Sequence, residues 1–203
     1  EVYVFMNCLP NVLGDDLLFV VKPYDLTKDE LIQLIKNHPE VKFISLMGID
    51  LSGNDTDEKI PINNFLDNTD EFLSGAVQTD GSSVTIPGIA TLNNGKVDFV
   101  ADLDSNWYVD YNFENIDGFL DKPVGTLRIP SFLYHNGKAV DSRSVLKNAV
   151  DNFKNTMQTI LAQYPSLLEG TDIKAEDIAD ISLTVATELE FWVKTPNDKA
   201  DIE

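Results

Sequence analysis

The sequence predicts an α+β protein, and three observations carry the prediction. Short apolar runs of strand length alternate with turn residues between residues 41 and 134. A compact helix signal precedes these runs, at residues 27–39. After Asp141 the apolar spacing changes to a helical period. We therefore expect several strands with two helices up to about Val140, then one long helix that leads into one final strand.

Composition excludes several classes of protein. The chain has 203 residues, of which 15 are Lys or Arg and 34 are Asp or Glu, so its formal net charge is −19. A general nucleic-acid surface or a surface for anionic membranes needs a basic face, so neither partner is expected. The single cysteine, Cys8, cannot form an internal disulfide and suits a reducing, cytoplasmic compartment. No apolar run approaches the roughly 20 residues that span a bilayer, and the amino end lacks the basic residues of a signal peptide.

The first elements are short. Two β-like runs, Val2–Phe5 and Leu17–Val21, lie on either side of a segment rich in turn residues. Thr27 and Glu30 then have the T-x-x-E spacing of a helical capping box, and Pro39 stops the helix that follows.

The middle of the chain predicts most of the sheet. Val41–Ile49 and Asp57–Ile62 are separated by a Ser-Gly-Asn-Asp turn and predict a hairpin. The remaining expectations are a short helix within Asn64–Leu73, a loop-rich stretch over Thr79–Asn94, strands at Val97–Ala101 and Thr126–Tyr134, and an acidic, aromatic and irregular region over Asp102–Val124.

The end of the chain predicts a long helix and a strand. Asp141 or Ser142 caps the helix, which continues to Pro165. Its apolar positions are Val145, Leu146, Ala149, Val150, Phe153, Met157, Ile160 and Leu161. The strand is expected over Ile181–Lys194, where alternation puts Glu188 and Glu190 on one face, roughly 6.5–7 Å apart. Two carboxylates so close repel each other, so this face either is solvated or holds a divalent metal ion.

A second candidate site is the loop Asp80-Gly81-Ser82-Ser83. Glycine allows a tight turn, and the loop presents one carboxylate and two hydroxyls around it. Asp80 could bind a cation, or the segment could be a plain turn. His38 and His135 lie in turns and lack the spacing of metal ligands, so we expect them to face solvent.

Five segments, in order and at suitable spacing, resemble glutamine synthetase. They are Val41–Leu46 with Asp50-Leu51-Ser52-Gly53 and Lys59-Ile60-Pro61, then Asp80-Gly81-Ser82-Ser83, Val97-Asp98-Phe99 through Asp104, Asp141-Ser142-Arg143-Ser144, and Glu188-Leu189-Glu190-Phe191. The resemblance covers residues 26–195. The chain departs from the family at Thr79, where an aromatic is usual, and at Ala186-Thr187, where Gly-Pro is usual.

The resemblance implies a fold, a reaction and roles for four residues. Residues 26–140 would form a β-grasp domain after an amino-terminal extension at 1–25, and residues 141–203 would begin a truncated catalytic domain with its long helix and first strand. Asp80 would act in catalysis, with Ser83, by binding ammonium at a neighbouring subunit of a homo-oligomer. Glu188 and Glu190 would be ligands of two divalent ions, Mg²⁺ or Mn²⁺. The reaction would be ligation of ammonia to glutamate with ATP, through γ-glutamyl phosphate.

Two alternatives remain open at the sequence level. Since most of the family's site would lie beyond Glu203, we expect the chain by itself to be an inactive amino-terminal fragment of the ligase. One alternative is a stand-alone β-grasp interaction module with an acidic surface for a basic partner. The other is a γ-glutamyl ligase of the same family that acts on another amine.

Overall fold

The computed structural model describes residues 17–85, 95–186, 188 and 190. The chain forms two compact units, Glu1–Lys147 and Asn148–Glu203. The first unit contains a mostly antiparallel sheet with short helices, so the predicted α+β class is confirmed. Within the described residues, none of the helices combines the length and the apolar character that a membrane span requires.

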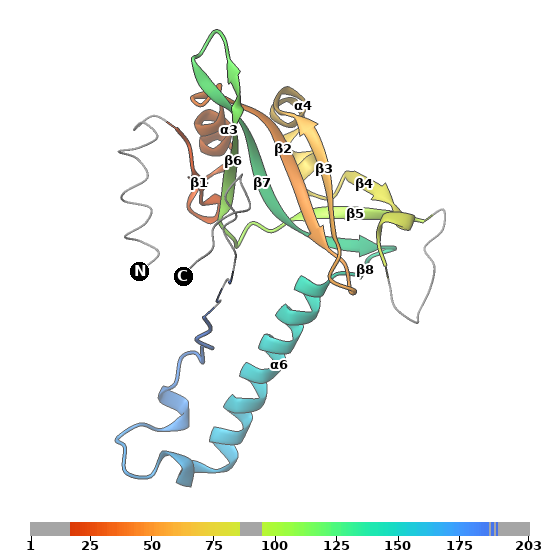
Figure 1. Cartoon of the computed structure of the whole chain (residues 1–203). Helices are drawn as coiled ribbons and strands as arrows, with labels where there is room; N and C mark the ends of the chain where they lie inside the picture. The colour runs from red at the N-terminus through yellow and green to blue at the C-terminus, as the bar shows by residue number, and fades with distance from the viewer. Residues whose placement is uncertain (1–16, 86–94, 187, 189, 191–203) are drawn as a thin grey trace, which may run out of the picture. The chain divides into compact units, whose positions relative to one another are not determined.

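One sheet organises the first unit (Figure 1). Its strands, within the described residues, are β1 (Val20–Val21), β2 (Val41–Ile49), β3 (Asp55–Pro61), β4 (Val77–Asp80), β5 (Lys96–Ala101), β6 (Trp107–Asp117), β7 (Lys122–His135) and β8 (Lys138–Ala139). The main path runs β1-β6-β7-β2-β3, while β5 pairs with both β4 and β7, and β8 pairs with β7.

The long strand β7 joins the two parts of this sheet. Its first half lies parallel to β2, with Ile44 opposite Leu127. Its second half pairs antiparallel with β5, with Phe99 opposite Leu133. Because β7 takes part in both pairings, it fixes the position of β4 and β5 relative to the β2–β3 hairpin.

Helix α3 (Lys28–Lys36) has the predicted capping box. The Glu30 amide donates to Thr27 Oγ1 at 3.3 Å, and the Thr27 amide donates to Glu30 Oε2 at 2.8 Å. These two bonds satisfy amides that the first turn leaves without partners. The helix ends before Pro39, as the sequence predicts. It contributes Leu31 and Ile35 to the core.

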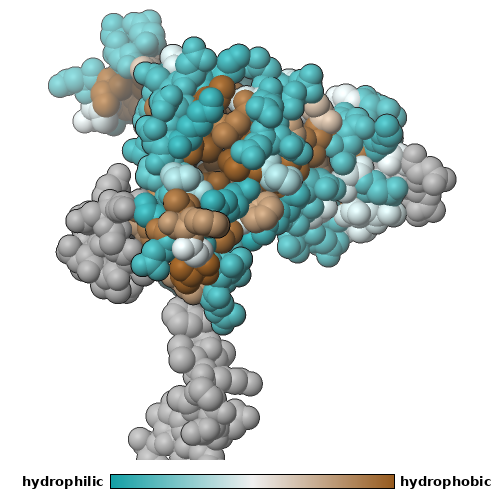
Figure 2. Space-filling model, turned by 90° about the horizontal axis from the view of Figure 1, so that it is seen from above, coloured by the Kyte–Doolittle hydropathy of each residue, from teal (hydrophilic) through white to brown (hydrophobic). Residues whose placement is uncertain are grey.

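The core forms between α3, the short helix α4 (Ile62–Asp67) and the sheet. Its fully buried members include Ile35, Ile44, Leu46, Phe65, Phe99, Trp107, Leu127, Ile129 and Leu133. Packing is tight between the end of β2 and β7: a Cβ added to Gly48 would lie 2.5 Å from Leu133 Cδ2. Only glycine fits at that position without moving Leu133. On the face drawn in Figure 2, hydrophilic residues predominate between smaller hydrophobic patches.

The sheet contains strands that the sequence analysis missed. The region Asp102–Val124, predicted to be irregular, contains the 11-residue strand β6. Buried residues (Trp107, Val109 and Tyr111) alternate with exposed ones at the start of this strand. The acidic and aromatic composition of the region obscured this alternation in the sequence. Part of the predicted loop Thr79–Asn94 belongs to β4, which pairs with β5.

Other boundaries also differ from the prediction. The run Leu17–Val21 forms a strand only at its last two residues. The helix expected within Asn64–Leu73 is divided into α4 and α5 (Thr69–Leu73). The run Val2–Phe5 lies outside the described residues.

The long helix α6 (Ser142–Gln163) is confirmed, and it begins in the first unit. Half of its predicted apolar positions are exposed and the other half are half-buried, and Ser144 is the only described residue of this helix that is buried. The short helices η3 (Pro165–Leu168) and η4 (Ala175–Asp177) follow in the second unit, where Lys154 Nζ lies 3.1 Å from Asp180 Oδ1.

The strand predicted over Ile181–Lys194 is wrong for the described part of that segment. Residues 181–186, 188 and 190 have no strand assignment, and Val185 is 84% exposed. A strand requires backbone hydrogen bonds to a neighbouring strand. The described part of the second unit contains no other strand that could provide them.

Candidate functional site

The candidate site is the loop of Asp80, Gly81, Ser82 and Ser83, which extends from the end of β4. Strand pairing places Asp80 opposite Lys96 of β5, and the Gly81 amide donates to the Gly95 carbonyl at 2.8 Å. Residues 81–83 then form a single turn of 3₁₀-helix, η2, in which Gly81 is buried. The loop is therefore held by backbone contacts on one side, while Asp80, Ser82 and Ser83 are exposed on the other.

The Asp80 carboxylate caps this turn. Its Oδ1 accepts a hydrogen bond from the Ser82 amide at 2.7 Å. Hydrogen bonds from the side chain and backbone of Ser82 hold the pKa of Asp80 below its ordinary value of 3.8. The carboxylate is therefore an anion at neutral pH. It is exposed, and its second oxygen can receive a cation or another hydrogen-bond donor.

Asp50, at the end of the β2–β3 hairpin, anchors the far side of the loop. This buried carboxylate accepts from the amides of Ser52 and Asn54 at 2.8 and 2.9 Å, which fixes the hairpin turn. It also accepts from the Thr85 amide at 2.8 Å, 35 residues away in the sequence. Burial acts to raise the pKa of Asp50, but these hydrogen bonds outweigh it and the pKa is lowered. One ionised carboxylate thus joins the hairpin turn to the segment that follows Ser83.

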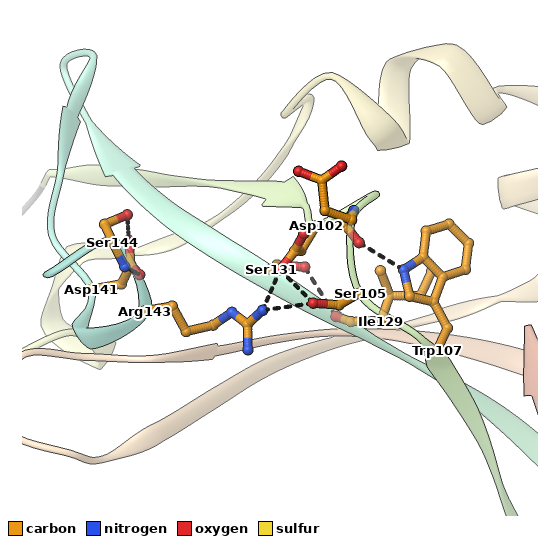
Figure 3. Close-up of polar contacts among 9 residues, drawn as sticks. Asp102, Ser105, Trp107, Ile129, Ser131, Asp141, Arg143 and Ser144 are labelled. Carbon is orange, nitrogen blue, oxygen red and sulfur yellow. Dashed lines mark hydrogen bonds and ion pairs between the residues drawn. The ribbon is translucent and has the colours of Figure 1, made fainter. Parts of the chain in front are cut away.

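Asp141 joins the start of α6 to the same end of the sheet. Its backbone forms an isolated antiparallel bridge with Asp50. Its buried carboxylate accepts from the Ser144 amide and Ser144 Oγ, both at 2.7 Å, and from the Leu133 amide at 3.0 Å. Figure 3 shows the pairing of Asp141 with Ser144. Of the two predicted caps, Asp141 and Ser142, it is therefore Asp141 that caps the helix, and its hydrogen bond from the Leu133 amide also joins the start of α6 to β7.

A second polar cluster lies beside this cap (Figure 3). Ser105 Oγ donates to Asp102 Oδ2 at 2.7 Å, and the Arg143 guanidinium donates to the same carboxylate and to Ser105 Oγ. Trp107 Nε1 donates to the Asp102 carbonyl at 2.9 Å. Burial acts to raise the pKa of Asp102, but Ser105 and Arg143 outweigh that effect and the pKa is lowered.

Sequence reasoning did not identify the roles of Asp102 and Arg143. Both residues belong to segments that resemble the family, but the sequence predicted no partner for either side chain. The only signal was the presence of a lone arginine at the start of a helix in a chain with few basic residues. Arginine at that point needs a nearby carboxylate to offset the positive end of the helix dipole.

The predicted metal ligands lie in the second unit. Glu188 and Glu190 are both exposed and are not in a strand. Asp80 and Ser83 belong to the first unit, so no single unit contains all four predicted site residues. Among the residues the structure describes, no group of three or more His, Cys, Asp or Glu side chains is placed to hold a metal ion.

Comparison with known proteins gives similarity in structure only. No protein-family model matches the chain, and no curated protein matches it in sequence. A solved structure described as "GmaS/ADP complex-Conformation 1" matches 60% of the chain at 15% identity with a TM-score of 0.41. The cryo-EM structure of Plasmodium falciparum glutamine synthetase matches 64% of it at 18% identity with a TM-score of 0.46. The match spans about a quarter of each of these chains, 25% and 23%. The second structure bears the name of the family that the motifs resemble.

Proposed function

We propose that the chain forms the amino-terminal part of a glutamine synthetase-type ligase, which joins ammonia to glutamate with ATP through γ-glutamyl phosphate. The observation that carries the proposal is the convergence of the motif segments. The hairpin turn at Asp50, the segment after the Asp80 loop and the start of α6 at Asp141 are joined directly by hydrogen bonds. Segments that resemble one family in sequence order therefore also meet in space, which a chance resemblance would not require.

In this proposal the Asp80 loop supplies an anion to a site completed by another subunit. The hydrogen bond from the Ser82 amide holds the carboxylate against the turn, and exposure leaves it open to a partner. Ammonium is a small cation whose N–H groups need oxygen acceptors, which Asp80 and the Ser83 hydroxyl provide. Since the described loop carries only one carboxylate, it needs further groups to form a complete site. Such an incomplete site fits a homo-oligomer better than an isolated chain.

The parallel pairing of β2 with β7, next to the β2–β3 hairpin, supports a β-grasp description of residues 26–140. The helix α3 precedes this hairpin and packs in the same core as it.

The described residues supply only part of a divalent-metal site. Glu188 and Glu190 are two exposed carboxylates, whereas Mg²⁺ and Mn²⁺ require about six oxygen ligands. The described residues alone do not fit a divalent ion. We propose the two glutamates only as part of a larger set of ligands. Divalent ions bound with ATP in such a ligase would act as Lewis acids toward the transferred phosphoryl group.

The decisive experiment uses Asp80→Ala in the protein that carries this chain together with a catalytic half. If Asp80 binds ammonium, the KM for ammonium should rise about tenfold or more, while the KM for ATP stays within about twofold. Asp55→Ala, at an exposed position at the start of β3, is the matched control and should leave both constants unchanged. Equal increases in both KM values would point to impaired folding or assembly instead.

Two further experiments distinguish the proposed ligase from a γ-glutamyl ligase for another amine and from an interaction module. The 203-residue chain alone should form no glutamine from glutamate, ammonium and ATP with Mg²⁺, and robust turnover by the purified chain would contradict the proposal. Replacing ammonium by methylamine tests amine specificity. Faster reaction with methylamine would favour a γ-glutamyl ligase for another amine, and no reaction in the longer protein would favour an interaction module.

A further inference from the structure

A cavity of about 390 Å³ lies in the first unit, away from the Asp80 loop. It forms where the end of α3, the start of β2 and the junction of β3 with α4 meet. Ile35, Val41 and Leu66 supply apolar walls, while Lys36, His38 and Lys42 bring three basic side chains to it. Its size is within the range typical of sites for small molecules.

The charge of this cavity is opposite to that of the chain as a whole. Acidic residues outnumber Lys and Arg by 34 to 15, yet none of the residues that line the cavity is Asp or Glu. A neighbouring cavity of about 270 Å³ shows the ordinary pattern, because Lys28 is accompanied there by Asp67, Asp70 and Glu71. The lining thus contributes three basic groups and no carboxylate of its own, while the carboxylates that contact two of these groups, Glu40 and Asp117, are not part of the lining.

A buried carboxylate holds one of the three basic groups in place. Glu40 is fully buried, and its Oε1 lies 2.8 Å from His38 Nδ1. Lys122 Nζ lies 3.9 Å from the other oxygen of Glu40. With Nδ1 engaged by Glu40, Nε2 is the ring nitrogen left for a ligand, and it donates to an anion when the imidazole is protonated. A buried partner of this kind fixes the ring orientation before any ligand arrives.

The two lysines are available to different degrees. Lys42 Nζ lies 2.8 Å from Asp117 Oδ2, so a ligand would share it with that carboxylate. Lys36 is exposed at the end of α3, and it forms no ion pair within the described parts of the first unit. The cavity therefore offers one unengaged ammonium group, one shared ammonium group and one oriented imidazole beside apolar walls.

We propose that this cavity binds a small organic phosphate monoester, with the phosphate between Lys36, His38 and Lys42 and the apolar part against Ile35, Val41 and Leu66. A phosphate monoester carries a charge of about −1.5 to −2 near neutral pH, which two lysines and an imidazole match better than they match a single carboxylate. This function does not depend on the ligase proposal, because none of these residues belongs to the Asp80 loop.

Phenyl phosphate is a suitable probe, with binding followed by NMR chemical-shift changes and by calorimetry on the 203-residue chain. We expect saturable binding of phenyl phosphate, weaker binding of benzoate and of inorganic phosphate, and no binding of phenol. Shift changes should centre on residues 35–42 and 61–66. Equal responses to phenol and phenyl phosphate, or no saturation with phenyl phosphate, would overturn the proposal.

Three substitutions and one control substitution test the assignment. Lys36→Gln and Lys42→Gln should each weaken phenyl phosphate binding about five- to tenfold, because each removes one charge-assisted hydrogen bond. Lys28→Gln, in the neighbouring cavity, is the matched control and should have no effect. Asp117→Asn should tighten binding, since it frees Lys42 while its amide oxygen can still accept from the Phe119 amide. If Asp117→Asn weakens binding, or if Lys28→Gln acts like Lys36→Gln, the assignment is wrong.

Discussion

The carboxylates at the end of the sheet differ sharply from those of the segment around Glu188 and Glu190. Asp50 and Asp141 are fully buried, and each accepts at least three hydrogen bonds from groups in the chain. Glu188 and Glu190 are exposed and lie in a segment without a strand assignment. Both regions resemble the same family in sequence, yet only the first is held by partners within the described chain.

The difference follows from where in the sequence the hydrogen-bond partners of each carboxylate lie. Asp141 needs only Ser144, three residues away, and Leu133, eight residues away. Buried carboxylates with all their partners present stabilise a fold, whereas carboxylates without partners must remain in water. The 181–190 segment would need a neighbouring strand and further ligands, which the described residues of its unit do not supply.

The largest effect is expected on removal of a fully buried carboxylate that accepts three hydrogen bonds. Asp141→Ala leaves the Leu133 and Ser144 amides without their acceptor and should lower the free energy of unfolding by about 3 kcal/mol. Urea unfolding followed by tryptophan fluorescence measures this, because Trp107 is fully buried in the same unit.

The matched control for Asp141→Ala is the exposed Asp55, at the start of β3. Asp55→Ala should change the free energy of unfolding by less than about 0.5 kcal/mol. If the two substitutions have the same effect, the polar contacts at this end of the sheet do not stabilise the fold in the way described.

A smaller effect should appear in acid. The pKa values of Asp50 and Asp102 are lowered in the folded protein, so both groups stabilise it fully above their unfolded pKa of about 3.9. That stabilisation is lost as pH falls through the lower folded pKa values. The free energy of unfolding should therefore decrease as pH falls below about 4.

Asp102→Asn tests the share of one group in this loss. The variant should be less stable than the parent at neutral pH and should show a shallower decrease in acid, measured by urea unfolding at several pH values. Asp55→Asn should retain the parent's slope. A parent chain whose stability does not change between neutral pH and about pH 3 would contradict the lowered pKa values.

Elements with local signals were predicted well from the sequence. The capping box of Thr27 and Glu30, the β2–β3 hairpin and the start of α6 at Ser142 each depend on residues close in sequence. Strand β6 was missed because Asp110 and Asn112 alternate with Trp107, Val109 and Tyr111, a pattern obscured by overall polarity. The Asp80 loop was identified, but its attachment to Asp50 was not. The Asp50–Thr85 contact joins residues 35 positions apart, and no local pattern encodes it.

The smallest effect is expected in the 181–190 segment. Glu188→Gln and Glu190→Gln should each change the free energy of unfolding of the 203-residue chain by less than about 0.5 kcal/mol, since neither side chain is buried.

Mn²⁺ should bind the chain only weakly, with a Kd of about 1 mM or above, because two carboxylates leave most of the ion's coordination to water. Calorimetry with Mn²⁺ on the parent chain and both variants measures this, and Glu176→Gln, at another exposed glutamate of the second unit, is the control. A sub-micromolar Mn²⁺ site that disappears in Glu188→Gln but persists in Glu176→Gln would mean that the chain completes a metal site by itself. The contrast between the two regions would then be wrong.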